Sequence, residues 1–367
     1  MSGVHVQPED WPVGRGISRG ALVILLILGW AVLFRPAASA QPEGERAQYE
    51  KLQKLIDAQA IRSRALRDVE RDFRLMLNKN PRSAYALTGL GRLAYKTGRL
   101  NRDRNEARAL DEAVRQLKQA AELDPKLFDA WYYLALAHLA RHKIEEARQA
   151  ADRAKAIAPD DYRSEHLLAE VALGEKKYDE AAAHGRSALD KTKDKKIQAE
   201  IYGLLSRVHR LRNDLDAAEE AYRKVLEIKP DAWGEVNYAS FLLEARKDFD
   251  GAIDHARKSL KHGDFWTGRR VLAQAALAKA DDLLWRRKKP VEAEPLFRLA
   301  IEKNPRLYEA HFGLGVCRYL EGERRKDPKT LLEAQGHLIL AIRLNPGLTK
   351  AREQLVQTEM KLRELSR

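Results

Sequence analysis

Residues 128–159, FDAWYYLALAHLARHKIEEARQAADRAKAIAP, form a unit of two amphipathic helices that the rest of the chain repeats. Four residues at i, i+3, i+4 and i+7 define one face of a first helix: Trp131, Leu134, Ala135 and His138. Alanines continue the pattern on a second helix: Ala147, Ala151 and Ala154. Pro159 then ends it. One such hairpin cannot bury its apolar face alone, so the chain must stack hairpins against one another.

Prolines mark how often the unit recurs. Six of them end a helical pattern: Pro81, Pro125, Pro159, Pro230, Pro305 and Pro346. The gaps between them are 44, 34, 71, 75 and 41 residues. Against a unit of about 34 residues, two further repeats lack the proline and end near Lys193 and Asp264. The other excess residues are insertions within repeats.

The order Trp-x2-Leu-Ala-x2-His, then Ala-x3-Ala, then Pro resembles the tetratricopeptide repeat. We therefore predict an all-α fold, a right-handed superhelical solenoid of about eight helical hairpins. The array spans residues 50–347, and its degenerate first repeat overlaps a helical lead-in over residues 41–64. Residues 348–367 should form a capping helix that covers the last stacking surface. Its predicted buried stripe is Leu355, Val356, Met360 and Leu362.

Small residues are expected where the two helices of a hairpin approach closely, because larger side chains would separate the backbones. The first-helix positions are Gly91, Ala135, Ala169, Ser206, Ser240 and Gly315, with Gln274 as a bulkier exception. The second-helix positions are Ala113, Ala147, Ala181, Ala218, Ala252, Ala293 and Ala334. Leucines supply buried apolar area between them: Leu90, Leu134, Leu168, Leu205 and Leu314. In the first repeat, Val69, Phe73 and Met76 fit the second helix.

The N-terminal 40 residues read as a targeting segment. Arg15 and Arg19 precede an uncharged apolar stretch over residues 20–34, and a small-x-small site follows at residues 38–40. These are the parts of a secretory signal peptide cleaved after Ala40. The stretch is short for a membrane span, which leaves a retained N-terminal inner-membrane anchor as the alternative. Either reading predicts an exported, bacterial-type protein of the periplasm or cell envelope.

Charge and cysteine content limit the function classes. The 67 Lys and Arg residues against 54 Asp and Glu give a net charge of +13, which favours acidic partners or surfaces. The single cysteine, Cys317, excludes an internal disulfide framework and a multi-cysteine metal site. Helical-repeat proteins also read RNA, so nucleic acid is a second class of partner. Export and the interleaving of acidic with basic residues argue against nucleic acid.

Three patterns imitate catalytic or binding motifs. Residues 89–94, GLGRLA, match a dinucleotide fingerprint but fall inside a predicted helix without a preceding strand. His138 and His142 are four residues apart, yet no third metal ligand accompanies them. Cys317 lies among apolar residues with no histidine and acid tied to it. We therefore expect no enzyme activity, no metal and no cofactor.

The resemblance implies a concave groove lined by first helices, in which other family members hold peptide segments. The groove candidates, carried over by position, are Tyr85, Arg92, Tyr95, Tyr132, His166, Glu170, Arg207, Arg210, Asn237, Phe241, Phe312 and Tyr319. Aromatic rings and arginine often dominate binding energy at interfaces. The Lys and Asn pair with which some members clamp a C-terminal carboxylate is not matched by Thr88 and Arg92 or by Asn237 and Phe241.

Insertions define a second candidate surface, at residues 101–110, 280–286 and 322–328. Each should lie between the first and second helix of its repeat and emerge on one edge of the solenoid. Two of them carry basic runs that stacking should bring together: Arg286, Arg287, Lys288, Lys289, Arg324, Arg325, Lys326 and Lys329. Such runs are often only solvated, but this edge could also dock an acidic protein surface or anionic headgroups.

The sequence thus predicts a non-enzymatic scaffold or adaptor that binds protein or peptide partners through the groove and the basic edge. The alternative is a basic helical-repeat protein that binds nucleic acid or an anionic cell-envelope polymer, such as polysaccharide or peptidoglycan assembly components.

Overall fold

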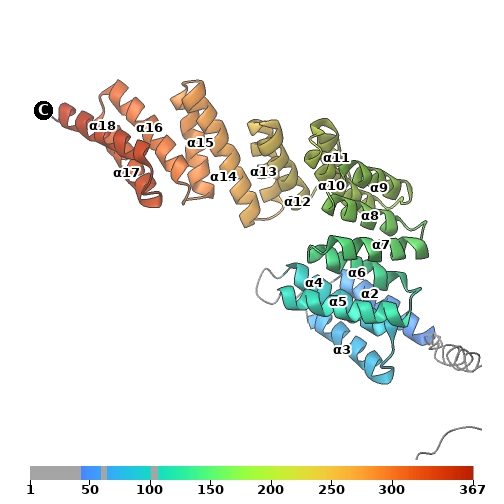
Figure 1. The fold of residues 1–367 in the computed structure, drawn as a ribbon. Helices are drawn as coiled ribbons and strands as arrows, with labels where there is room; N and C mark the ends of the chain where they lie inside the picture. The colour runs from blue at the N-terminus through green and yellow to red at the C-terminus, as the bar shows by residue number, and fades with distance from the viewer. Residues whose placement is uncertain (1–42, 59–63, 101–105, 367) are drawn as a thin grey trace, which may run out of the picture. The chain divides into compact units, whose positions relative to one another are not determined.

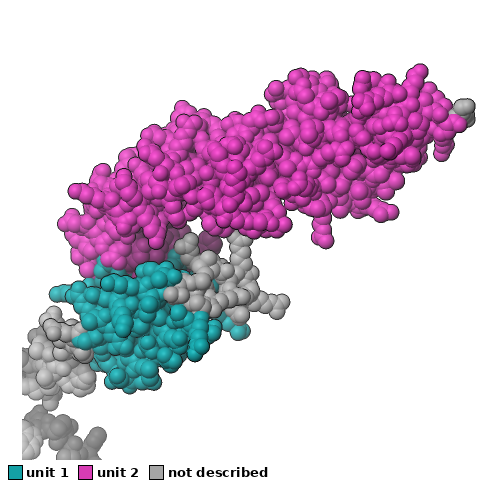
Figure 2. Space-filling view, turned by 180° about the vertical axis from the view of Figure 1, so that it is seen from behind, with its two compact units in different colours: residues 1–130 teal, residues 131–367 magenta. Residues whose placement is uncertain are grey.

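The computed structural model describes residues 43–58, 64–100 and 106–366 (Figure 1). The predicted targeting segment, residues 1–40, lies outside the described residues. The chain divides into two compact units, residues 1–130 and 131–367 (Figure 2). Each unit is described by itself below.

The described residues form helices and no strand. The helices of the first unit are α2 (Glu43–Ala58), α3 (Arg64–Lys79), α4 (Ala84–Leu100) and α5 (Glu106–Leu123); α6 (Phe128–Ala140) begins there and continues into the second unit. The second unit holds α7 (Ile144–Ile157), α8 (Tyr162–Gly174), α9 (Tyr178–Asp190), α10 (Lys195–Leu211), α11 (Leu215–Ile228), α12 (Ala232–Phe241), α13 (Phe249–Lys261), α14 (Trp266–Asp281), α15 (Pro290–Lys303), α16 (Tyr308–Arg325), α17 (Pro328–Leu344) and α18 (Thr349–Leu365). Two π-helical turns, η1 (Leu242–Arg246) and η2 (Asp282–Arg286), extend α12 and α14. Helices α2 to α17 give eight successive pairs before α18, so the predicted helical-repeat solenoid is confirmed.

Small side chains lie where the paired helices approach each other most closely, as predicted. All seven second-helix alanines, from Ala113 to Ala334, are completely buried. The five predicted leucines are also buried, as are Val69, Phe73 and Met76 of the first repeat. Because alanine has a small side chain, the two backbones of a hairpin can approach closely here and pack at the density of a protein interior.

Two first-helix positions were assigned one residue too late. Gln274 is exposed and Ser240 is half-buried, whereas the preceding residues, Ala273 and Ala239, are completely buried. The cause is the π-turn: η1 adds one residue between the buried alanine of α12 and the turn that follows. A spacing of 34 residues measured from Ser240 reaches Gln274, so the same displacement by one residue recurs in α14.

The glycine-rich stretch in α4 serves packing. A Cβ on Gly89 would lie 2.3 Å from the ring of Phe73 in α3, and one on Gly91 would lie 2.5 Å from Leu117 in α5. Gly313 and Gly315 repeat the arrangement in α16, against Phe297 of α15 and Leu338 of α17. The first glycine admits a large side chain from the preceding hairpin and the second admits one from its own partner helix.

The turn inside each hairpin of the second unit contains one residue in the left-handed region. These residues have φ between 53° and 63°, and they are His142, Lys176, Asn213, Lys247, Lys288 and Lys326. Each follows the end of a first helix, where such a residue lets the chain reverse and satisfies the last carbonyl groups. For example, the N–H of Lys177 donates to the carbonyl of Ala172 at 2.9 Å.

The C-terminal helix differs from its predicted packing. Val356 is 54% exposed and Met360 is 64% exposed, while Ala351 and Thr358 are the buried residues of α18. Leu355 and Leu362 are half-buried. The buried face is therefore turned by one to two residues from the predicted stripe, because it follows small side chains that fit against α17 and leaves the larger ones outside.

The insertions lengthen helices more than they form loops. Residues 101–105 lie outside the described residues, but residues 106–110 open α5. Residues 282–286 form η2, and residues 322–325 are the last turn of α16. The prediction that the insertions lie between the first and second helix of a repeat is therefore wrong for residues 106–110, 282–286 and 322–325, which belong to the helical segments themselves.

Candidate functional site

A hollow of about 310 Å³ lies among α10, α11 and α12 and brings four predicted groove residues together. Arg207 and Arg210 come from α10, and Asn237 and Phe241 come from α12. They stand on two successive first helices at positions that face the same side. The backbone at Gly203 forms part of the lining, and a Cβ there would meet nothing within 4 Å. We call this cavity the α10–α12 hollow.

Its inner wall is aromatic. Phe241 is 1% exposed and packs on Tyr222, with ring centroids 5.0 Å apart. Phe241 was predicted as a groove contact; its side chain belongs to a buried core cluster, although the residue also lines the hollow. Burial raises the pKa of the Tyr222 phenol, and the fields of Arg210 and Arg207 oppose that rise. The phenol stays neutral at pH 7.

The rim is charged. Arg207 Nη2 donates to Glu170 Oε1 of α8 at 2.7 Å, and Arg210 Nη1 lies 3.6 Å from Glu244 Oε2. The side chain of Arg207 is 49% exposed and that of Arg210 is 39% exposed, so each arginine keeps donors that a ligand can reach. His166 lies near the first pair, and burial lowers its pKa, so it is neutral at pH 7. Two arginines and an amide beside an aromatic wall suit a chain that carries carboxylates.

The groove candidates of the first unit are engaged in packing. Tyr95 is 8% exposed, which contradicts its prediction as a groove contact. Arg92 pairs with Asp57 of α2, and Tyr85 packs on Tyr49 with ring centroids 5.3 Å apart. The side chains of Arg92 and Tyr85 therefore join α4 to α2, through an ion pair and a ring contact.

The remaining groove candidates lie apart from the α10–α12 hollow. Tyr132 packs edge-on against Tyr133, and Tyr319 donates to Glu323 at 3.1 Å. Phe312 stacks on Trp285, with centroids 5.7 Å apart. These two rings line another hollow, of about 430 Å³, with residues of α18. Trp285 also donates to Asp281, whose burial raises its pKa to about 6.

Exposed tryptophans were missed by the sequence analysis. Trp233 is 60% exposed and Trp266 is 69% exposed, each in the first turn of a first helix. Arg270 lies over the ring of Trp266 at 5.4 Å, and Phe265 lies 5.5 Å from Trp233. The sequence did carry a signal for these two residues. Each tryptophan precedes the buried i, i+3 and i+4 positions of its helix, so it lies outside the buried stripe, although tryptophan is highly buried on average.

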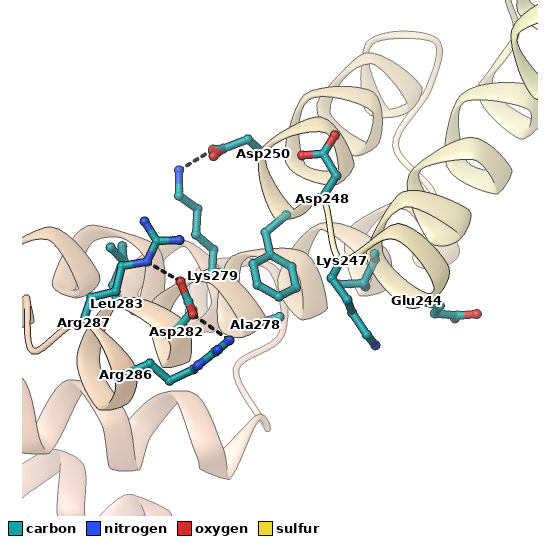
Figure 3. A pocket seen from close by; sticks show the side chains of 12 residues that line it. Glu244, Lys247, Asp248, Asp250, Ala278, Lys279, Asp282, Leu283, Arg286 and Arg287 are labelled. Atoms are coloured by element: carbon teal, nitrogen blue, oxygen red, sulfur yellow. Dashed lines mark hydrogen bonds and ion pairs between the residues drawn. The ribbon is translucent and has the colours of Figure 1, made fainter. Parts of the chain in front are cut away.

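The basic runs divide between two cavities. Figure 3 shows the larger, of about 680 Å³, where Arg286 and Arg287 turn toward Asp282 and Lys279 reaches Asp250. Asp282 lies 3.3 Å from Arg286 and 2.6 Å from Arg287. These two arginines therefore share one carboxylate, which offsets one of their two positive charges. Lys288 and Arg324 instead line a different hollow together, so residues from both runs do meet. Lys326 and Lys329 are exposed outside these cavities.

The residues that imitated chemistry have structural roles. Cys317 is 2% exposed, and burial raises the pKa of its thiol to about 12, so it stays protonated. His142 is an exposed turn residue and His138 is half-buried in α6. No group of three or more His, Cys, Asp and Glu side chains in the described residues could hold a metal ion. None of the described helices is long and apolar enough to cross a membrane.

Comparison with known proteins supports the repeat assignment. Two tetratricopeptide repeat models match, one over residues 105–171 and the other over residues 160–231. Superkiller complex protein 3 of Homo sapiens is 26% identical over 240 residues, which are 65% of this chain and 13% of that protein. The Mus musculus protein is 26% identical over 278 residues, 75% of this chain and 15% of that protein. The chain therefore spans about a seventh of the length of these curated relatives.

Solved structures agree in fold. The C-terminal part of a TPR repeat-containing protein from Cytophaga hutchinsonii has a TM-score of 0.54 at 13% identity, over 72% of this chain and 98% of that chain. The human IFIT1 dimer with m7Gppp-AAAA has a TM-score of 0.53 at 14% identity, over 86% of this chain and 71% of that chain. At these identities the likeness concerns the fold alone. The two family models thus identify tetratricopeptide repeats over residues 105–231, and helical pairs also flank this range in the described residues.

Proposed function

We propose that the chain is a non-enzymatic scaffold that holds an extended, acidic peptide segment of a partner protein in the α10–α12 hollow. The observation that carries the proposal is the meeting of Arg207, Arg210 and Asn237 around one aromatic-walled cavity. Each arginine can offer a pair of donors to a carboxylate, and Asn237 can bond a peptide group. Repeat proteins of this kind commonly bind protein partners, and the curated relatives are named as members of a complex.

Gly203 allows the hollow to be blocked without disturbing the fold. Gly203→Leu should place a side chain in the open space, and it should leave stability equal or raise it by about 0.5–1 kcal/mol because glycine is a poor helix former. Affinity capture with the parent protein and mass spectrometry would identify candidate partners. We expect the direct partner to be lost from Gly203→Leu.

Gly336→Leu is the matched control, since Gly336 of α17 also has nothing near its Cβ and lies outside the hollow. Equal recovery of every partner by Gly203→Leu and Gly336→Leu would refute the hollow as the peptide site. Binding of single-stranded RNA that Gly203→Leu alone abolishes would favour the nucleic-acid alternative.

We also propose that this scaffold is exported and works in the cell envelope. The basis is the apolar stretch of residues 20–34 between Arg19 and a small-x-small site. If the signal is cleaved, the exported protein should begin at Gln41 on N-terminal sequencing. Retention of Trp30 would indicate an anchor instead, and an inactive phosphatase reporter fused after Arg367 would refute export.

A further inference from the structure

A second cavity, of about 390 Å³, lies between the start of α15 and the C-terminal half of α16. Its apolar lining includes Leu284 of η2, Val291 of α15 and Leu320 of α16. Leu284 is buried, but Val291 is 75% exposed and Leu320 is 39% exposed. Its volume falls within the range of about 300–1,000 Å³ that is usual for ligand pockets. We call it the η2–α16 hollow.

The acidic groups of this hollow are already neutralised. Glu321 accepts from Arg318 at 2.5 Å and lies 3.1 Å from Arg325. Glu294 lies 3.4 Å from Arg318 and 2.9 Å from Arg298. Arg318 is 17% exposed, so this network is largely fixed within the fold.

The cations of the hollow have no such partners. Lys288 enters from the turn before α15 and Arg324 from the last turn of α16, and both are exposed. Among the described residues, neither forms an ion pair within 4.0 Å. The hollow thus presents apolar walls beneath two available positive charges.

We infer that the η2–α16 hollow is a second docking site, for an acidic segment of a protein partner that inserts one bulky apolar side chain. The apolar side chain would cover Val291 and Leu320, and flanking carboxylates would meet Lys288 and Arg324. The inference rests on the proposed scaffold function but uses a different cavity. Charge complementarity selects an acidic segment, and the concave apolar lining favours a side-chain anchor over a flat array of lipid headgroups.

The charge test uses a fluorescein-labelled synthetic peptide of twelve residues, with one leucine among glutamates, and fluorescence anisotropy. Lys288→Glu with Arg324→Glu should weaken binding roughly tenfold. The matched control is Lys326→Glu with Lys329→Glu, which makes the same charge change in the neighbouring run without touching the hollow. It should weaken binding by less than about threefold. Equal losses in the two double variants would overturn the inference, because they would show only a diffuse positive field.

The anchor test removes apolar contact from either side. Changing the peptide leucine to alanine, or Leu320→Ser in the protein, should each weaken binding roughly tenfold. Leu332→Ser is the control, since Leu332 is 57% exposed and lies outside the hollow. Unchanged affinity after either anchor change would refute a side-chain site. A second result would also refute it: the protein binds vesicles containing phosphatidylserine more strongly than it binds the peptide, and Leu320→Ser leaves the vesicle binding intact.

Gly203→Leu separates this inference from the proposed function. It should leave peptide binding at the η2–α16 hollow unchanged, because Gly203 lines only the other cavity. Suppose instead that Gly203→Leu abolishes peptide binding and the double variant Lys288→Glu with Arg324→Glu does not weaken it. That result would place the acidic segment in the α10–α12 hollow and overturn the second site.

Discussion

Phe297→Ala is expected to lower the free energy of unfolding by about 3–5 kcal/mol. Phe297 is completely buried in a core cluster that joins α14, α15 and α16, and its ring lies against Gly313. Alanine would leave a cavity that rigid helices on both sides cannot close. Urea unfolding followed by circular dichroism measures the loss. Hydrogen exchange should place the greatest loss of protection in α15 and α16, since repeats mainly contact their neighbours.

The pairing of Phe297 with Gly313 can be tested from the other side. A Cβ on Gly313 would lie 2.2 Å from the Phe297 ring, so Gly313→Ala should cost about 1–3 kcal/mol by overpacking. Adding Phe297→Leu should recover part of that loss, because the smaller side chain makes room. Gly336→Ala, a helix glycine with nothing near its Cβ, should instead be neutral or stabilising. Additive losses in the double variant would contradict the proposed contact.

Glu165→Ala is expected to cost about 3 kcal/mol, near the lower end for breaking a buried ion pair. The side chain of Glu165 is 8% exposed, and its carboxylate receives Lys155 at 2.6 Å, Lys191 at 3.1 Å and His184 at 2.7 Å. Without the carboxylate, the two ammonium groups would share the carbonyl oxygen of Pro159 and lose the carboxylate that bonds both of them. Thermal and urea unfolding at pH 7 measure the effect. A loss below about 0.5 kcal/mol would show that the pairs act as ordinary surface ion pairs.

The same carboxylate makes stability depend on pH. Burial acts to raise the pKa of Glu165, but hydrogen bonds from Lys155, His184 and Lys191 outweigh it and hold the pKa at about 2. Because the folded pKa lies below the unfolded value, the stabilisation is full above about pH 4.5 and is lost as the pH falls towards 2. Glu165→Gln should therefore flatten the stability profile over this interval. Glu235→Gln is the matched control, since Glu235 is similarly buried but, within the part of the chain that the structure describes, bonds a single side chain, His255, at 2.6 Å.

The sequence predicted the helical pairs because the repeat fixes a periodicity of small and apolar residues. It was correct at every second-helix alanine, where one close backbone approach admits only a small side chain. It was wrong at Ser240 and Gln274, since a π-turn adds a residue without changing the composition around it. It was also wrong for Val356 and Met360, because the packing of α18 depends on α17 rather than on the apolar content of α18 itself.

For the candidate site, position within the repeat was informative but insufficient. It placed Arg207, Arg210 and Asn237 among the groove candidates, and the structure finds these three side chains around one hollow. It could not separate Phe241 and Tyr95, which share such positions but turn into the core. Nor could it show which basic residues have acidic neighbours: Arg287 is paired with Asp282, whereas Lys288 beside it is not. Such distinctions depend on side-chain neighbours from other repeats.

The lysines in the hairpin turns make the second unit less stable to heat than its backbone would allow. Lys176, Lys247, Lys288 and Lys326 all hold a backbone conformation that glycine adopts without steric penalty. Each therefore holds the unit a few tenths to about 1 kcal/mol below what the same backbone could reach. The melting temperature of this unit can be engineered upward at exposed turns, one hairpin at a time, without altering a single buried side chain.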